Sequence, residues 1–531
     1  MPDKMSWFKK IFKLPIYPFL FAAFPVFFLY AYNIEEVTFA AVLRPLVLAV
    51  AGTLIFFLLL KVIFRNWAKS ALLTTASLVI FFSHGHIHNL IGSVNLNLWR
   101  FQLGTDNLLF GVWAILILSL FIFLLRTKCT FGKLTGFLNF VGIVLVIYTL
   151  VTSLPYEINR WFNSLKQSRE TVTTAIADIN YKPDIYYLIF DRYAGNSVLK
   201  DLYGYDNSDF TKYLEEKGFY VAYKALANYP RTLLSLSSSL NFDYLDSEKA
   251  KFTDQLKYHE VGRFLKENGY RYLHLGSWAG ATTTSPIADV NFQVRDTYID
   301  VDEFSLRLFE STALAPVVRK LFPQSAVFEF HAAHKIRALY QVARLKEIPA
   351  SQPGPKFVFA HVLLPHDPYV LDSDCSDHKA TKDMLADYLL QLSCTNQLLK
   401  ETVEAILENS PQPPVIIIQG DEGPLNFSTL QPLKYPFKAD QSYKQADVRS
   451  MQERSEILNS YYLPGVNQSK TLYPTISPVN TFRLIFNLYF GTDLKILPDR
   501  SYIFKDRGDL YDIESGFNFI DVTDKIRRSQ K

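Results

Sequence analysis

Five long apolar stretches before residue 155 constrain this chain more than any other feature of its sequence. They lie at about 14–32, 41–60, 71–92, 107–125 and 134–153. Each is close to the roughly 20 residues that an α-helix needs to cross a bilayer. The first stretch is too long for a signal peptide, and four more follow it. We therefore predict an α-helical membrane domain of five transmembrane helices over residues 1–155.

Basic residues alternate between the loops of this region and predict its orientation. Lys4, Lys9, Lys10 and Lys13 precede the first stretch, and the second and fourth loops also carry basic residues, whereas Glu35 and Glu36 occupy the first loop. Cytoplasmic loops are enriched in Lys and Arg, so we expect the N-terminus to lie inside. An odd number of spans then places the remainder of the chain outside.

A histidine-rich segment, Ser83–Asn89, lies in the outer half of the third predicted span. Histidine is costly in hydrocarbon and is often functional there. The segment is consistent with a polar pocket for a lipid head group. The favoured alternative is interfacial side chains that contact water or a neighbouring helix.

The pattern changes after a polar juxtamembrane linker at 156–183. Strand-like runs at 184–191, 271–278, 356–364 and 414–420 alternate with helix-like runs such as 208–219 and 381–409. This alternation predicts an α/β domain with a mainly parallel central sheet over residues 184–531. The charge pattern offers no nucleic-acid-binding surface, and three cysteines are too few for a disulfide framework or a zinc finger.

Acidic residues follow two of the predicted strands. Asp191 ends "YYLIFD", and Asp421 and Glu422 come directly after "PVIIIQG". Carboxyl ends of parallel strands meet at one edge of a sheet, so the three carboxylates are expected to converge. Like charges that close raise one another's pKa unless a cation neutralises them, and a divalent metal is the simplest cation. The alternative is chance, because a strand often ends in an acidic residue followed by glycine.

Two further motifs supply candidates for chemistry. In "NYPRTLLSLSSSL", Thr232 lies at the start of a predicted helix, where unpaired amides favour an anion and a metal could make the hydroxyl a nucleophile. The alternative for Thr232 is an ordinary N-cap. In "FAHVLLPHDPYV", His361 and His366 follow a strand, and His366 could protonate a leaving group. Either histidine could instead be structural.

Taken in order, "PDIYYLIFDRYAG", "NYPRTLLSLSSSL", "LLPHDPY", "IIIQGDEGP" and "ISPVNTFRLIFNLYFG" resemble the alkaline phosphatase superfamily, in its branch of sulfatase-like membrane phosphotransferases. That branch includes lipoteichoic-acid synthases and phosphoethanolamine transferases. The resemblance implies metal ligation by Asp191, Thr232, Asp421 and Glu422, with Thr232 as nucleophile. It implies that His366 contacts the transferred phosphoryl group.

Glu422 stands where the family usually has histidine. A carboxylate-rich site favours Mn²⁺, with Zn²⁺ or Mg²⁺ as alternatives. We expect Arg231 and His361 to bind substrate, with Arg231 neutralising phosphate charge. No C/S-x-P-x-R motif of true sulfatases surrounds Thr232.

The resemblance implies an enzyme on the outer face of the cytoplasmic membrane. It would move a phospholipid-derived head group, of phosphoglycerol or phosphoethanolamine type, through a phospho-threonine to an envelope glycan or lipid. A membrane phospholipid is the expected donor. The alternatives are a phosphoric or sulfuric ester hydrolase, and a non-catalytic protein with a degenerate metal site.

Five further residues carry secondary expectations. Cys375 and Cys394 both lie in the external domain and are either bonded to each other or free, whereas Cys129 lies in a cytoplasmic loop and cannot pair with them. His274 and Trp278 either line the acceptor side of the site or pack in the core.

Overall fold

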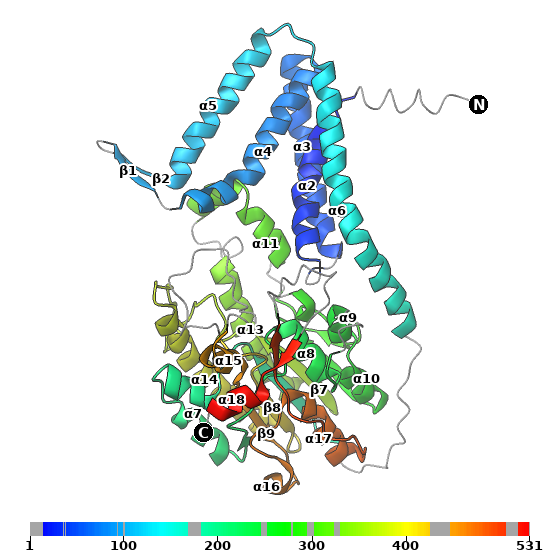
Figure 1. Cartoon of the computed structure of the whole chain (residues 1–531), viewed down its shortest axis with the longest axis vertical. Helices are drawn as coiled ribbons and strands as arrows, with labels where there is room; N and C mark the ends of the chain where they lie inside the picture. The colour runs from blue at the N-terminus through cyan, green and yellow to red at the C-terminus, as the bar shows by residue number, and fades with distance from the viewer. Residues whose placement is uncertain are drawn as a thin grey trace, which may run out of the picture. The chain divides into compact units, whose positions relative to one another are not determined.

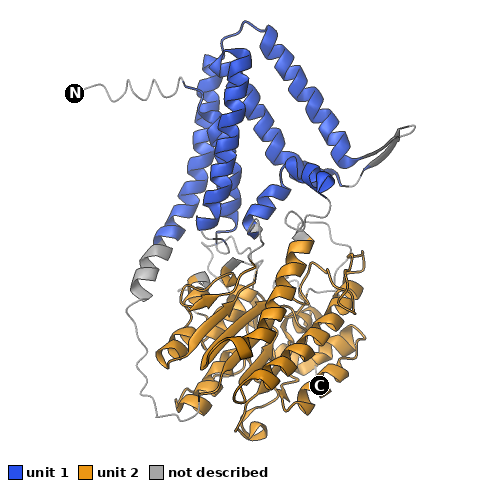
Figure 2. Cartoon of the chain, turned by 180° about the vertical axis from the view of Figure 1, so that it is seen from behind, with its two compact units in different colours: residues 1–161, 299–330 blue, residues 162–298, 331–531 orange. Residues whose placement is uncertain are grey.

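The computed structural model describes residues 14–34, 37, 39–92, 94–98, 101–167, 182–245, 252–277, 280–294, 302–322, 330–424, 446–505 and 519–529. The chain divides into two compact units, drawn in different colours in Figure 2. Unit 1 comprises residues 1–161 and 299–330, and unit 2 comprises residues 162–298 and 331–531.

Unit 1 contains four helices that are long and apolar enough to cross a membrane. They are α3 (Phe39–Phe64), α4 (Trp67–Ile91), α5 (Thr105–Arg126) and the first part of α6 (Gly132–Gln167). The first predicted span forms α2 (Tyr17–Tyr32), which has 16 residues and is about 24 Å long, against a hydrocarbon core of roughly 30 Å. The five-span prediction is therefore confirmed only for four helices among the described residues. A short hairpin, β1 (Asn95–Leu98) and β2 (Phe101–Gly104), precedes α5.

Two helices from far along the chain belong to the same unit, which the sequence did not predict. They are α11 (Glu303–Glu310) and α12 (Leu314–Leu321). Phe304 and Leu308 pack among apolar side chains of α2 and α3. Gly85 of α4 donates its backbone N–H to the Ser311 carbonyl at 2.9 Å, and a Cβ at Gly85 would lie 2.6 Å from the Glu310 carbonyl oxygen. Glycine at position 85 is thus what lets the α11–α12 turn approach α4.

The histidine-rich segment lies at the end of α4, and His84 contacts a neighbouring helix. Its Nε2 lies 3.2 Å from an Asp106 carboxylate oxygen, and Trp113 Nε1–H donates to its Nδ1 at 3.2 Å. Both partners belong to α5, so the buried His84 ties α4 to α5. This geometry favours the helix-contact interpretation over a head-group pocket for His84.

Unit 2 is built on a seven-stranded sheet with the order β4–β9–β8–β3–β7–β5–β6 (Figure 1). Strands β8, β3, β7, β5 and β6 run parallel to their neighbours in that order, and β9 pairs antiparallel with β8 and β4. The prediction of a mainly parallel sheet is confirmed. The strands are β3 (Ile185–Phe190), β4 (Tyr220–Val221), β5 (Arg271–Leu275), β6 (Val290–Asn291), β7 (Lys356–Val362), β8 (Val415–Gln419) and β9 (Asn459–Tyr462).

Helices cover both faces of this sheet because its central strands are apolar on both sides. Tyr186 and Leu188 of β3 pack in one core with α7, α13 and α14, and Ile185 and Tyr187 pack in a second core with α8, α10 and α17. Successive side chains of a strand point to opposite faces, which explains this division. These helices are α7 (Ser208–Glu216), α8 (Thr232–Leu240), α10 (Glu260–Glu267), α13 (Phe330–Ser351), α14 (Met384–Asn409) and α17 (Pro478–Phe490).

Shorter elements and one disulfide complete the unit. Cys375 and Cys394 are bonded, with their Cα atoms 5.0 Å apart, which settles the alternative left open by the sequence. The shorter elements are η1 (Val198–Leu202), α9 (Phe252–Lys257), η3 (Gly280–Thr282), α15 (Val448–Ser455), α16 (Gln468–Thr471), β10 (Tyr502–Phe504), β11 (Phe519–Asp521) and α18 (Thr523–Ser529).

Candidate metal centre and active site

The carboxyl ends of three adjacent strands meet at one edge of the sheet. Strand β3 lies between β7 and β8, and Ile189 pairs with His361 on one side and with Gln419 on the other. This register brings together Asp191 after β3, His361 near the end of β7 and Asp421 after β8. All three are buried, and one potential ligand atom from each lies within 4.8 Å of the others. They form a group with the composition and spacing of a metal site.

Hydrogen bonds hold this group but leave some of its oxygens unused. His361 Nε2 lies 3.2 Å from Asp191 Oδ2 and 3.9 Å from Asp421 Oδ2. The backbone N–H of Arg192 donates to Asp421 Oδ1 at 3.1 Å. Within the described part of the chain, the buried Asp191 Oδ1 and Asp421 Oδ2 have no hydrogen-bond partner. Buried carboxylate oxygens without a donor are costly, and a divalent cation would satisfy them.

The electrostatics of the group point the same way. Burial, followed by the charges of Asp191 and Glu422, raises the pKa of Asp421 to about 7, although His361 and the Thr232 side chain act in the opposite direction. Burial also opposes ionisation of Asp191, but the charges of His366 and His361 hold its pKa well below the ordinary value. The nearby positive charges thus favour ionisation of Asp191 but not of Asp421. A metal ion would let both ionise.

His361 is oriented by a second layer of buried side chains. Its Nδ1 lies 2.9 Å from the Thr282 hydroxyl oxygen, which lies 2.6 Å from the Ser277 hydroxyl oxygen. His274 Nε2 lies 2.8 Å from the Thr282 carbonyl oxygen, and Tyr272 OH lies 2.9 Å from His274 Nδ1. When His361 Nδ1–H donates to Thr282, the Nε2 lone pair faces the two aspartates. His274 is thus a buried supporting residue, and Trp278 lies outside the described residues.

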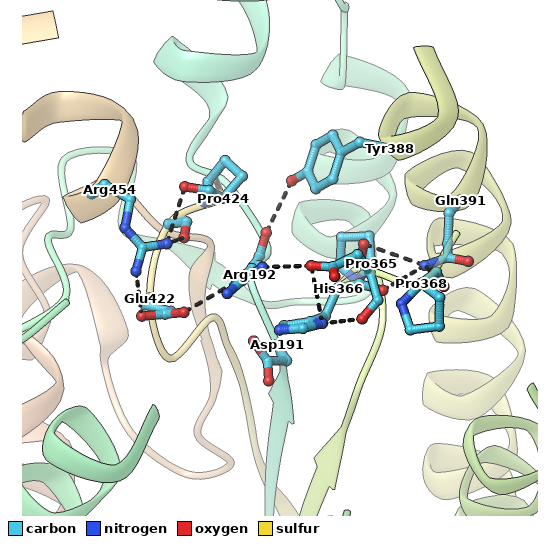
Figure 3. A network of polar contacts seen from close by, with 12 residues as sticks. Asp191, Arg192, Pro365, His366, Pro368, Tyr388, Gln391, Glu422, Pro424 and Arg454 are labelled. Atoms are coloured by element: carbon cyan, nitrogen blue, oxygen red, sulfur yellow. Dashed lines mark hydrogen bonds and ion pairs between the residues drawn. The ribbon is translucent and has the colours of Figure 1, made fainter. Parts of the chain in front are cut away.

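Glu422 lies between two arginines, Arg192 and Arg454 (Figure 3). Arg192 Nε donates to Glu422 Oε1 at 3.1 Å, and Arg454 Nη2 donates to Oε2 at 2.7 Å. Both carboxylate oxygens are therefore engaged. The two arginines compensate the charge of Glu422, which still raises the pKa of the adjacent Asp421. Glu422 is not among the residues that the structure groups around a potential metal position.

Arg192 links both carboxylates through an uncommon backbone conformation. Its φ of 60° lies in the left-handed region, which costs a non-glycine residue free energy and is often stabilised at functional sites. In this conformation its N–H reaches Asp421 while its side chain reaches Glu422, and Nη1 also contacts Asp367 at 2.6 Å. Tyr388 OH donates to the Arg192 carbonyl at 3.0 Å and helps to hold the turn.

Arg454 of α15 joins the Glu422 turn to the segment that precedes Thr232. Its Nη1 donates to the carbonyl oxygens of Gly423 and Pro424 at 2.7 and 3.2 Å, and its Nη2 donates to that of Pro230 at 2.5 Å. The backbones approach so closely that a Cβ at Gly423 would lie 2.1 Å from the Glu453 carbonyl oxygen. Sequence reasoning missed Arg454 because α15 carries no motif. Sequence reasoning also missed Arg192, although its position directly after Asp191 could have identified it as a residue of the site.

Thr232 is the first residue of α8, as the sequence predicted. The N-cap is Arg231 and not Thr232, so the alternative of an ordinary Thr N-cap does not apply. The side chain of the half-buried Thr232 lowers the pKa of Asp421, so it lies near the Asp191–His361–Asp421 group. The guanidinium of Arg231 lies over the Phe504 ring, 5.5 Å from its centroid.

His366 lies in the loop that follows β7 and is partly exposed. Its Nδ1 is 3.5 Å from Asp367 Oδ1, and its carbonyl accepts a hydrogen bond from Gln391 Nε2 at 2.8 Å. Figure 3 shows its ring near Asp191, in line with its effect on the pKa of Asp191. The structure thus brings Asp191, His361, Asp421, Thr232 and His366 into one neighbourhood.

No protein-family model and no curated protein matches the chain. Solved structures are similar to it. The C-terminal periplasmic domain of EcEptC from Escherichia coli matches with a TM-score of 0.43 and 12% identity, and the match covers 68% of this chain and 99% of that domain. The C-terminal periplasmic domain of phosphoethanolamine transferase EptC from Campylobacter jejuni matches with a TM-score of 0.35 and 13% identity. That match covers 60% of this chain and 93% of that domain.

BT1596, a 2-O GAG sulfatase, matches with a TM-score of 0.38 and 10% identity, and the match covers 61% of this chain and 78% of that chain. The sequence motifs resemble the sulfatase-like membrane phosphotransferases, a branch that includes phosphoethanolamine transferases.

Proposed function

We propose that the chain is a membrane-bound, metal-dependent phosphotransferase that acts on a phospholipid head group. The observation that supports this most is the position of Thr232, the first residue of helix α8, with its side chain near enough to Asp421 to lower the pKa of that buried carboxyl, in a group with unused carboxylate oxygens. A hydroxyl at a helix N-terminus beside a cation would suit attack on an anionic phosphorus centre.

Asp191, His361 and Asp421 would hold one divalent cation, and Thr232 lies close enough to contribute its hydroxyl. Their nitrogen and carboxylate donors suit Zn²⁺ or Mn²⁺. The preference for Mn²⁺ expected from the sequence rested on Glu422, whose oxygens are engaged by arginines. The cation would neutralise the two aspartates and stabilise negative charge on the transferred phosphoryl group.

The reaction would proceed in two displacements. Thr232 loses its proton to water, its oxygen attacks the phosphorus of the head group, and the bond from phosphorus to the glyceride oxygen breaks. His366 gives a proton to that oxygen, which releases diacylglycerol. His366 then takes the proton of an acceptor hydroxyl, whose oxygen attacks the phosphorus of the phospho-threonine. The bond from phosphorus to the Thr232 oxygen breaks, and that oxygen takes a proton back from water. Arg231 would neutralise charge on the bound phosphate. The acceptor would be an envelope glycan or lipid outside the cytoplasmic membrane.

The covalent intermediate gives the most direct test. Full-length protein is incubated with a phospholipid and Mn²⁺ or Zn²⁺, digested, and examined by mass spectrometry. We expect the peptide containing Thr232 to gain the mass of the phosphorylated head group in wild type and not in Thr232→Ala. Product formation without added mass on Thr232 would refute the scheme. Head group released free, and never transferred to an acceptor hydroxyl, would favour the hydrolase alternative.

A further inference from the structure

A cavity of about 670 Å³ lies within unit 1, between α3, α4 and the α11–α12 segment. This volume is within the roughly 300–1,000 Å³ typical of sites for small molecules. Its walls are mainly aliphatic and aromatic, with Leu48 and Phe56 from α3, Phe81 from α4, and Leu306 and Phe309 from α11. The cavity is separate from every residue of the metal centre, all of which belong to unit 2.

Small residues on one face of α3 create this space. Pro45, Ala49 and Gly52 follow one another at intervals of four and three residues, so they share one face of the helix. A Cβ placed on Gly52 would meet no atom within 4 Å. A larger side chain at position 52 could therefore enter the cavity without a backbone clash. The far wall is held by the backbone hydrogen bonds that join α4 to Ser311 and Ala313.

A positively charged side chain lies among the apolar residues that line the cavity. Among the described residues that line the cavity, Arg44 carries the only charge. It lies one to two turns from the start of α3, a helix apolar enough to cross a membrane. A guanidinium beside an apolar cavity complements a ligand with a hydrocarbon part and an anionic group, and its planar donors match the oxygens of a phosphate.

We propose that this cavity binds an acyl chain of a membrane phospholipid, whose phosphate is paired with Arg44. The apolar helices that form it would lie in a bilayer, so this ligand surrounds them at high concentration. Binding would occur whether or not unit 2 transfers phosphoryl groups, because no residue of the metal centre contributes to the cavity.

Photolabelling of the full-length chain tests this assignment. The protein is reconstituted in phosphatidylglycerol and phosphatidylcholine vesicles that contain a trace of phosphatidylglycerol with a diazirine near the end of one acyl chain. After irradiation and digestion, the labelled peptides are identified by mass spectrometry. We expect labels concentrated on residues 44–56 and 302–314, and we expect Gly52→Leu to lose most of them because the leucine fills the cavity.

Gly111→Leu is the matched control. Gly111 lies in α5, does not line the cavity, and a Cβ there also meets no atom within 4 Å. This variant should keep the wild-type labelling pattern. Equal labelling of the 44–56 and 302–314 peptides in Gly52→Leu and Gly111→Leu would overturn the proposal.

Arg44→Gln separates the phosphate contact from simple hydrophobic occupancy. The wild-type cavity should be labelled more strongly by the diazirine phospholipid than by a diacylglycerol carrying the same diazirine, because the latter lacks phosphate. Arg44→Gln should remove that difference. A wild-type protein that labels equally with both probes would exclude a role for Arg44 in head-group recognition.

Discussion

Replacing Glu422 by glutamine should destabilise unit 2 without removing the proposed metal ion. The Glu422 side chain is only 4% exposed and accepts charge-assisted hydrogen bonds from Arg192 and Arg454. Glutamine keeps one acceptor oxygen but presents an N–H₂ group to the second arginine, and it removes the negative charge that both guanidinium groups face, although Arg192 keeps its ion pair with Asp367. A hydrogen bond to a charged group contributes ~1.5–3 kcal/mol. Because one such bond is lost and the ion pairs of the buried Glu422 are removed, the expected decrease in the free energy of unfolding is ~3–5 kcal/mol, the range found when one partner of a buried ion pair is removed.

The assay is urea unfolding of the full chain in detergent, followed by circular dichroism, together with elemental analysis of the folded protein. Glu401→Gln is the matched control. Glu401 forms an ion pair with Lys346 at 3.0 Å, and its side chain is 43% exposed. Such surface pairs contribute ~0–1 kcal/mol. Asp421→Asn is the comparison for metal content and should lose the ion. A Glu422→Gln protein as stable as the control would show that the two ion pairs contribute little and would refute the reasoning. A Glu422→Gln protein as poor in metal as Asp421→Asn would indicate that Glu422 is a metal ligand.

Three further predictions concern the residues around the site and the domain that carries it. Thr282→Val should weaken metal affinity about 10- to 100-fold, because the group that orients the His361 ring is lost. Thr282→Ser should retain the affinity, and competition with a chelator measures both variants. Burial lowers the pKa of His259 from 6.5 to about 3, so between these values the unfolded chain binds a proton that the fold excludes. Stability should therefore fall as the pH drops below 6.5, and in His259→Gln the slope of unfolding free energy against pH should be smaller by up to ~1.4 kcal/mol per pH unit. Reducing the Cys375–Cys394 disulfide, which links residues 19 apart, should cost ~3 kcal/mol in urea unfolding, and a Cys375→Ser, Cys394→Ser variant should show no response to reductant.

The sequence predicted that Asp191 and Asp421 follow strands and that Thr232 starts a helix, because the ends of strands and helices are local features. Asp191 and Asp421 each follow a short apolar run, and the parallel sheet then brings them together. Thr232 was assigned to a helix start, and α8 begins there. These predictions needed only the alternation of strands and helices and the rule that ligands bind at the carboxyl ends of strands.

Contacts between residues distant in sequence were beyond that reasoning. The sequence paired Glu422 with Asp421 because they are adjacent, but both carboxylate oxygens of Glu422 are engaged by Arg192 and Arg454. His361 was assigned to substrate, yet register places its Nε2 between the two aspartates. A side chain's direction after a strand depends on partners tens or hundreds of residues away, and no local pattern encodes it.

The assignment of α11 and α12 to unit 1 also depends on contacts between residues that are distant in sequence. Helices α11 and α12 have eight residues each, far below the length of a transmembrane span, so hydropathy did not separate them from the external domain. Their place in unit 1 depends on Phe304 and Leu308 packing against α2 and α3, and on the absence of a side chain at Gly85.

That discontinuity has a consequence for biosynthesis. Residues 162–298 of unit 2 are translated between the two parts of unit 1. The ribosome therefore produces residues 162–298 of unit 2 before α11 and α12 of unit 1 exist, so unit 1 cannot complete its fold until part of unit 2 has been made. Until α11 is made, the apolar side chains of α2 and α3 that pack against Phe304 and Leu308 lack those two partners. The time needed to translate residues 162–298 therefore sets the shortest delay before unit 1 can complete this core.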